Sequence, residues 1–144
     1  MTTSINTEPK LPELKLLVSA PVTVRWGDMD AYNHVNNAVY ATYVEEARIR
    51  WFSTLHPNWK GAETAPILAA LSMNFRRPIE WPAELVVDMY AGRIGRSSFT
   101  AVFRIVDRDQ PDTLYAEGDS VIVWMDPRSG KSIELPAHVR AALV

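Results

Sequence analysis

The alternation of apolar and polar residues first becomes regular at residues 22–26 (VTVRW), where a period of two predicts a β-strand. The segment before it, residues 1–19, keeps no period and contains two prolines. We therefore expect a loosely ordered lead-in, followed by a single domain over residues 20–144. Residues 27–34 are rich in Gly, Asp and Asn, which favour turns, so a loop should follow the strand.

A longer period follows from Asn37 to about Leu55. Its apolar side chains recur at spacings of four, three and four: Tyr40, Val44, Ala47 and Trp51. This spacing places them on one face of an α-helix. Asn36 or Asn37 is a suitable N-cap, because the Asn side-chain oxygen accepts from a free N–H of the first turn. The His-Pro-Asn sequence at residues 56–58 is a suitable end.

Period-two alternation returns in the second half of the chain and predicts four strands, at residues 71–76, 85–89, 99–105 and 114–125. Gly95-Arg96 and residues 109–112 are typical of hairpin connections, and residues 136–143 of a short closing helix. Such short connections join neighbouring strands only in an antiparallel sheet. The sheet must also cover the apolar face of the helix. The pattern therefore predicts an α+β fold, a curved antiparallel sheet wrapped around one long central helix.

Composition narrows the class of protein without changing this picture. The chain has 144 residues, 47% of them hydrophobic, with a formal net charge of −2 and no cysteine. This length and apolar content fit one packed domain, and the charge disfavours a nucleic-acid-coating surface. The lack of cysteine excludes disulfides, a cysteine nucleophile and thiolate metal sites. No apolar run reaches the about 20 residues that cross a bilayer, and no signal-peptide pattern is present, so we expect a cytoplasmic protein.

Polar chemistry is concentrated in the loop before the predicted helix. Residues 26–37 (WGDMDAYNHVNN) contain Asp28, Asp30, His34 and three asparagines. A helix N-terminus presents free N–H groups and about half a unit of positive charge, which polarise a carbonyl placed there. A carboxylate just upstream can activate water as a general base or attack the carbonyl carbon directly. Together these groups suit thioester hydrolysis, which requires neither a metal nor a cysteine.

The same segment resembles the signature of the 4-hydroxybenzoyl-CoA thioesterase-like branch of the hotdog superfamily. The matching residues are Trp26-Gly27-Asp28-Met29-Asp30, His34-Val35-Asn36-Asn37, Tyr40, Tyr43 and Glu45-Glu46-Ala47-Arg48. The order of elements matches over residues 20 to about 140. The resemblance implies the hotdog fold and an acyl-CoA thioesterase activity. It makes Asp30 the catalytic carboxylate and the backbone N–H of Asn37 the donor that polarises the thioester.

The motif also implies roles for neighbouring residues. His34, Asn36 and Tyr40 are predicted substrate contacts, although each has a structural alternative: bracing the loop, capping the helix and packing in the core. Asp28 is expected to order the loop through backbone hydrogen bonds. Asn33 departs from the family, which commonly has Gly there. Because Asn also tolerates a left-handed backbone, we expect the turn to survive.

A further similarity concerns coenzyme A. Arg93, Arg96, Ser97 and Ser98 flank a predicted hairpin. They are similar to residues with which related thioesterases hold the phosphates of coenzyme A, and Arg can bind phosphate oxygens bidentately. A solvated turn is the alternative, and Arg76-Arg77 is a second candidate. Coenzyme A is part of the substrate, and no metal or organic cofactor is implied. The resemblance further implies a homodimer with the active site at the seam, or a homotetramer made of two dimers.

Several alternatives stay open. Some hotdog enzymes use a helical Glu as base or nucleophile, but for Glu45 and Glu46 we favour a charged outer face with Glu46 paired to Arg50. A hydratase or dehydratase usually carries a Gly-His-Phe-Pro turn or an Asp-x-Asn-Pro-x-x-His pattern, and the sequence contains neither. A non-catalytic module that binds acyl-CoA or acyl carrier protein is disfavoured by Asp30. The sequence leaves open the acyl group, the carrier, and whether Asp30 is base or nucleophile.

Overall fold

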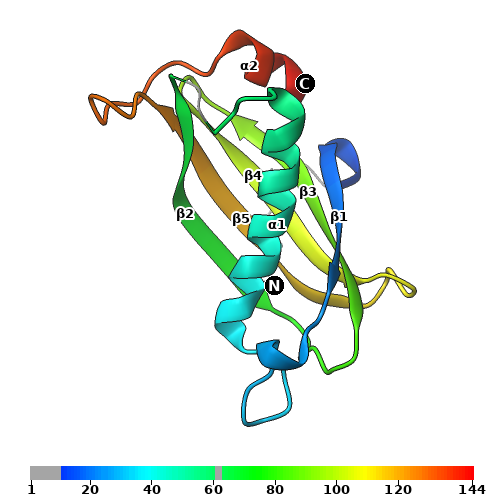
Figure 1. Ribbon diagram of the computed structural model, residues 1–144. Helices are drawn as coiled ribbons and strands as arrows, with labels where there is room; N and C mark the ends of the chain where they lie inside the picture. The colour runs from blue at the N-terminus through cyan, green and yellow to red at the C-terminus, as the bar shows by residue number, and fades with distance from the viewer. Residues whose placement is uncertain (1–10, 61–62) are drawn as a thin grey trace, which may run out of the picture.

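A five-stranded antiparallel sheet wraps around one long helix (Figure 1). The computed structural model describes residues 11–60 and 63–144. In chain order the elements are β1 (Lys15–Thr23), α1 (Asn37–Leu55), β2 (Ala65–Phe75), β3 (Glu84–Ile94), β4 (Ser98–Asp107), β5 (Leu114–Met125) and α2 (Ala137–Leu143), with 3-10 turns at Leu11–Glu13 and Trp26–Asp28. The predicted α+β architecture, a curved antiparallel sheet around a central helix, is confirmed.

The strand order is β1-β3-β4-β5-β2, which makes β1 and β2 the two edges of the sheet. Residues 95–97 and 108–113 form the β3–β4 and β4–β5 hairpins that the sequence predicts. β2 pairs antiparallel with β5 alone. The chain therefore has to pass from one side of the sheet to the other through residues 76–83 before β3 begins. This connection and the β1–α1 loop lie at the same end of the molecule (Figure 1).

Both edge strands are longer than the sequence pattern predicts. β1 begins at Lys15, inside the segment expected to be a lead-in, whereas residues 1–10 of that segment lie outside the described residues. At its other end the strand stops before Trp26, which belongs to a 3-10 turn instead. β2 begins at Ala65 rather than at residue 71. Residues 65–70 (APILAA) show no alternation, and an edge strand exposed on both faces does not require one.

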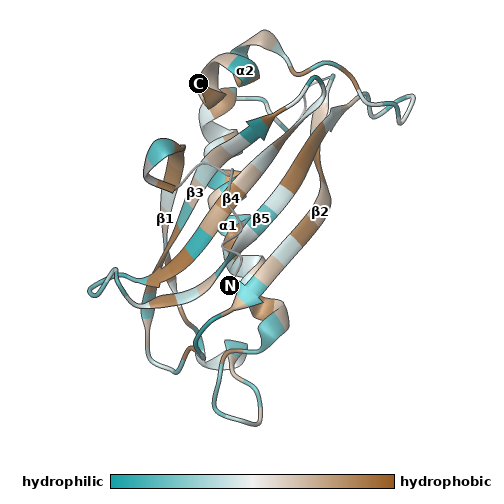
Figure 2. Cartoon of the chain, turned by 180° about the vertical axis from the view of Figure 1, so that it is seen from behind, coloured by the Kyte–Doolittle hydropathy of each residue, from teal (hydrophilic) through white to brown (hydrophobic). Residues whose placement is uncertain are grey.

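The predicted apolar face of α1 forms the centre of the core. Tyr40, Val44, Ala47 and Trp51 are all buried, with exposed fractions of 0–3%. Alternate residues of β3 and β4 pack against the N-terminal half of this face. Burying each large apolar side chain stabilises the folded state by about 1.5–3 kcal/mol. Figure 2 shows the uncovered side of the sheet, where hydrophobic and hydrophilic stretches alternate along the strands. The core therefore lies between the helix and the inner face of the sheet.

The ends of α1 follow the sequence signals. The Asn36 side chain caps the helix by accepting a hydrogen bond of 2.9 Å from the Ala38 N–H, and the backbone of His56 is extended where the helix stops. α2 closes the molecule beside that C-terminal end, with Val139 and Leu143 buried (Figure 1). Neither helix of the described chain has the length and apolar run needed to cross a bilayer.

Candidate active site

Asp28 anchors the loop between β1 and α1 as a buried carboxylate. It is 2% exposed and accepts hydrogen bonds from the Arg25 N–H and guanidinium at 2.8–3.1 Å and from the Tyr43 hydroxyl at 2.8 Å. Burial alone would raise the pKa of Asp28, but the bonds from Arg25 and Tyr43 outweigh it and hold the pKa below its usual value. Burial and the same carboxylate raise the pKa of the Tyr43 hydroxyl. The expected role of Asp28 in ordering the loop fits this geometry.

Asp30 begins a tight turn that leads back toward α1. Its N–H donates to the His34 carbonyl at 2.8 Å, and its carbonyl accepts from the Asn33 N–H at 3.1 Å. One side-chain oxygen, Oδ1, accepts from the Tyr32 N–H at 2.8 Å. Asn33 occupies the left-handed region at φ 59°, so the turn forms with Asn where the resembled family commonly has Gly. Asp30 is therefore a turn carboxylate, and its second oxygen, Oδ2, takes no bond within residues 11–60 and 63–144.

The backbone amide of Asn37 opens α1. The backbone N–H groups on either side of it already make hydrogen bonds. The Asn36 N–H donates to the Asp28 carbonyl, and the Ala38 N–H donates to the Asn36 side-chain oxygen. Among the hydrogen bonds of the described residues, none uses the Asn37 N–H. This amide also stands at the positive end of a helix of 19 residues. A free N–H in that position can donate to a carbonyl oxygen and polarise it.

Asp30 and Asn37 line the same cleft, which we call the Asp30 cleft. It encloses about 400 Å³, within the usual range for ligand sites. Its walls come from the loop, the first turn of α1 and the segment after β2: Asp30, Tyr32, His34, Val35, Asn37, Tyr40, Phe75, Arg76, Arg77 and Pro78. Four of the predicted site residues are thus brought together: Asp30, His34, Asn37 and Tyr40. Asn36 is exposed and serves as the cap.

Tyr40 is both a core residue and a wall of the cleft. It is 2% exposed, and its ring packs edge-to-face on Phe75 with ring centroids 4.9 Å apart. Its hydroxyl donates to the Arg77 carbonyl at 3.4 Å, and burial raises its pKa. The contribution of residues 75–78 to the cleft was not predicted from the sequence, apart from the weaker candidate Arg76-Arg77. The two adjacent arginines at the end of the strand predicted over residues 71–76 were the sequence signal for this wall of the cleft.

The predicted coenzyme A residues lie elsewhere in the chain. Arg93, Arg96, Ser97 and Ser98 belong to the β3–β4 hairpin, which α2 holds through bonds of 2.9 and 3.2 Å from Arg140 to the Gly95 and Arg96 carbonyls. This hairpin is at the C-terminal end of α1, whereas the β1–α1 loop that carries Asp30 is at the opposite end (Figure 1). The 19 residues of α1 span about 28 Å at about 1.5 Å per residue. One chain therefore does not bring this hairpin and Asp30 together.

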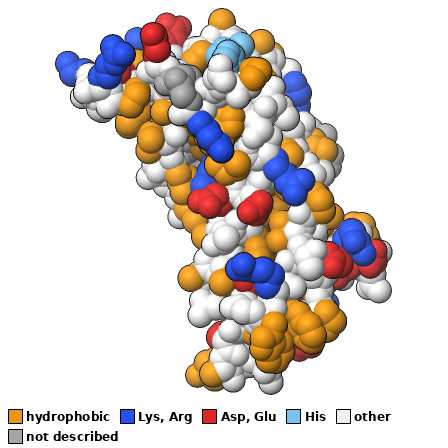
Figure 3. All heavy atoms as spheres, in the orientation of Figure 1, with side chains coloured by type: hydrophobic (Ala, Val, Ile, Leu, Met, Phe, Trp, Pro, Cys, Tyr) orange, Lys and Arg blue, Asp and Glu red, His pale blue; other side chains and the backbone are white. Residues whose placement is uncertain are grey.

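The charged residues of α1 follow the predicted outer face, with a different partner. Glu45 and Glu46 are exposed, and Figure 3 shows charged side chains gathered over the helix. The expected pair of Glu46 with Arg50 is not among the ion pairs of the described residues. Instead Glu45 lies 3.5 Å from Arg48, one turn away, and burial lowers the pKa of Arg48. Arg48 is itself buried, with 8% of its surface exposed, and it is the ion-pair partner of Glu45.

Comparison with known proteins shows the kind of chain to which this architecture belongs. The family model described as thioesterase-like superfamily matches residues 24–143. A Pseudomonas aeruginosa protein provisionally described as a thioesterase is 40% identical with a TM-score of 0.86, covering 90% of this chain and 100% of that one. A Xanthomonas campestris protein provisionally described as an acyl-CoA thioesterase is 42% identical with a TM-score of 0.74, covering 78% and 96%.

A third similar structure contains a ligand. It is a thioesterase of Thermus thermophilus complexed with coenzyme A and Zn, 31% identical with a TM-score of 0.77, covering 89% of this chain and 92% of that one. The likeness to these structures confirms the hotdog architecture expected from the sequence motif.

Proposed function

We propose that this chain, which belongs to the thioesterase-like superfamily and is a thioester hydrolase, cleaves an acyl-CoA into a free acid and coenzyme A by means of Asp30 and the Asn37 amide. One observation carries the proposal: a carboxylate with an unoccupied oxygen and a helix N-terminal amide with no bond inside the described chain line one cleft. The coenzyme A held by the Thermus thermophilus relative supports this choice of carrier.

In the proposed reaction the thioester carbonyl oxygen accepts from the Asn37 N–H at the start of α1. The N–H and the helix dipole stabilise the negative charge that develops on this oxygen. Asp30 Oδ2 either removes a proton from water as the water attacks the carbonyl carbon, or attacks that carbon itself to form an anhydride that water then opens. Both routes break the carbon–sulfur bond, and the sulfur of coenzyme A leaves as a thiolate that takes up a proton, from Asp30 in the first route and from water in the second. The Tyr32 amide holds Oδ1, which fixes the direction of Oδ2.

A release assay for free thiol over short, medium, long and aromatic acyl-CoAs, with crotonyl-CoA added as an enoyl substrate, tests this activity. We expect thiol release with at least one class. Loss of an enoyl double bond by hydration without thiol release would instead indicate a hydratase, and binding of acyl-CoA without turnover would indicate a sensor.

We further propose that a second copy of the chain pairs with β2 to form a homodimer. Within residues 11–60 and 63–144 no strand pairs with the outer edge of β2, which carries four apolar side chains at 40–47% exposure: Ile67, Leu68, Leu71 and Phe75. Long apolar edges of this kind are suited to strand pairing. Two β2 strands in antiparallel register would place the Ala65 end of one copy beside the Phe75 end of the other, and Phe75 lines the Asp30 cleft. Two such dimers can form a tetramer.

This pairing also reconciles the two halves of the predicted site. It would bring the β3–β4 hairpin end of one copy toward the Asp30 cleft of the other. In that arrangement Arg96 and its neighbours would hold the coenzyme A phosphates across the seam. Replacing Arg96 with Ala should raise KM for acyl-CoA more than for the matching pantetheine thioester, which lacks the nucleotide phosphates. Equal effects on both substrates would remove Arg96 from phosphate binding and leave Arg76-Arg77 as the candidates.

A further inference from the structure

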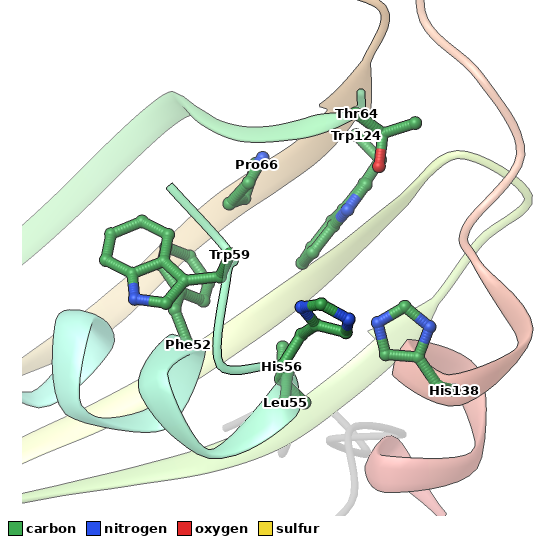
Figure 4. A pocket seen from close by; sticks show the side chains of 8 residues that line it. All are labelled: Phe52, Leu55, His56, Trp59, Thr64, Pro66, Trp124 and His138. Carbon is green, nitrogen blue, oxygen red and sulfur yellow. The ribbon is translucent and has the colours of Figure 1, made fainter. Parts of the chain in front are cut away.

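A second cavity lies at the opposite end of α1 from the Asp30 cleft. It encloses about 180 Å³ and is lined by the eight side chains labelled in Figure 4, which we call the aromatic chamber. Phe52 comes from the last turns of α1, Trp59 from the segment after it, and Trp124 from β5. No part of the proposed hydrolysis uses this chamber.

The aromatic walls of the chamber are closely packed. The Phe52 ring lies 5.5 Å from the Trp59 ring and 6.0 Å from the Trp124 ring, measured between centroids. Phe52 and Trp124 are each 4% exposed, so their side chains are fixed by packing in the hydrophobic core. An apolar protein cavity of about 150 Å³ stays dry and binds benzene. The aromatic chamber, at about 180 Å³, therefore suits one aromatic ring or a chain of about six carbons.

Two imidazoles stand at the wall of the chamber. His56 ends α1 and His138 lies on α2, and their ring centroids are 6.3 Å apart. His56 Nδ1 accepts the Asn58 N–H at 3.0 Å, so the proton of a neutral ring is on Nε2. Figure 4 shows a nitrogen of each ring facing the other. No hydrogen bond joins the two rings among the bonds of residues 11–60 and 63–144.

This arrangement suits an anionic acceptor. One oxygen that accepts a bond of about 2.9 Å from each ring fits between centroids 6.3 Å apart. The Lys60 ammonium, 5.8 Å from the centroid of the Trp59 ring, adds positive charge at the same end of the molecule. A ligand for this site therefore needs an apolar body of limited size and a negatively charged oxygen at one end.

We propose that the aromatic chamber binds a small apolar carboxylic acid, with the carboxylate between His56 and His138 and the chain or ring inside the chamber. The choice of an acid rests on the proposed function, because hydrolysis of a short or aromatic acyl thioester releases a molecule of this class. The site is distinct from the Asp30 cleft of the same chain, since the length of α1 separates the two. Binding at the chamber requires no turnover.

Calorimetric titration of the full chain with hexanoate and with 1-hexanol tests the proposal. Both ligands fill the chamber, but only hexanoate can accept from the two imidazoles. His138 is exposed on α2, so His138→Ala should leave the fold intact. We expect this variant to bind hexanoate about tenfold more weakly than wild type and to bind 1-hexanol with unchanged affinity. Leu55→Trp, which fills the chamber, should abolish both. Arg108→Ala, in the β4–β5 loop and outside the lining of both the chamber and the Asp30 cleft, is the surface control and should alter neither.

The proposal is overturned if hexanoate binds wild type no more tightly than 1-hexanol, or if His138→Ala binds hexanoate as wild type does. Should Leu55→Trp fail to fold, as its thermal unfolding would show, the exposed His138 variant still decides. Repeating the titration in Asp30→Asn separates the two proposals. Hexanoate binding that persists there, together with unchanged thiol release, would contradict the role of Asp30 and leave the chamber standing.

Discussion

At the scale of single residues, two carboxylates two positions apart have different surroundings. Asp28 is buried and accepts bonds from Arg25 and Tyr43. Asp30 is half-buried, and within the described part of the chain its side chain accepts only from the Tyr32 amide. Sequence position alone does not separate them, because Asp is common in turns. Their hydrogen-bond partners distinguish the two carboxylates, because Tyr43 is 15 residues from Asp28 and reaches it only when α1 packs on the sheet. We therefore expect Asp28 to govern stability and Asp30 to govern turnover.

Replacing Tyr43 with Phe should lower the free energy of unfolding by about 1.5–3 kcal/mol, because it removes a buried hydrogen bond to a charged group. Denaturant titration measures this loss. Tyr32→Phe is the matched control, since Tyr32 is 81% exposed and its hydroxyl has no bond inside the described chain, and it should change stability very little. Equal losses in the two variants would contradict the anchoring role of Asp28.

Acid should remove the stabilisation that the Tyr43 hydrogen bond to Asp28 provides. The pKa of Asp28 is held below its unfolded value, so its ionised form stabilises the folded state above the usual carboxyl pKa of about 3.9. That stabilisation is lost as pH falls through the folded pKa. The difference in unfolding free energy between wild type and Tyr43→Phe should accordingly shrink below about pH 4. A difference that persists unchanged under conditions acid enough to protonate Asp28 in the folded chain would show that the Tyr43 bond does not depend on the ionised carboxylate.

At the scale of elements, local chemistry made some segments predictable and others not. The bounds of α1 follow from its Asn36 cap and its apolar period, both readable from sequence. The extent of β2 does not, because an edge strand exposed on both faces shows no alternation. The aromatic chamber also left no sequence signal, since Phe52, Trp59 and Trp124 come from separate segments that only the fold brings together. The Asp30 cleft was partly predictable, because its loop residues are contiguous.

The turn before α1 offers a test at this scale. Asn33 has φ 59°, a region that Gly enters freely and Ala enters at a cost. Asn33→Gly should keep both stability and thiol release near wild type. Asn33→Ala should lower the free energy of unfolding by about 1 kcal/mol or more and reduce kcat, because the turn sets the position of the Asp30 carboxylate. Identical behaviour of the two variants in unfolding and kinetics would contradict this account of the turn.

At the scale of the whole molecule, the β1–α1 loop that carries Asp30 and the β3–β4 hairpin occupy opposite ends of one chain (Figure 1). The sequence motif implied a joint site but could not say that one chain separates its parts. Exposed aromatic residues also gather at the cleft end, with Trp26 69%, Tyr32 81% and Trp81 47% exposed, and orange side chains cover this lower end in Figure 3. The proposed dimer through β2 would cover the exposed edge and bring the separated parts toward each other.

The oligomeric state is measurable by light scattering during size-exclusion chromatography. The chain mass is 16.2 kDa, and we expect wild type at twice or four times that value. Leu71→Arg places a charge on the β2 edge and should reduce the mass of the assembly. Leu16→Arg introduces the same side chain on the opposite edge, β1, at a residue of similar exposure, and should leave the β2 pairing intact. An assembly broken by the β1 variant and not by the β2 variant would place the seam elsewhere.

The central claim is that the Asp30 carboxylate and the Asn37 amide act on one carbonyl, and thiol release by Asp30→Asn tests it most directly. Asn keeps the size of the side chain and can still accept from the Tyr32 amide, so the variant should match wild type in thermal unfolding. We expect its kcat to fall by about 10²–10⁴-fold on the best acyl-CoA substrate. A folded Asp30→Asn variant that releases thiol at the wild-type rate would contradict the account.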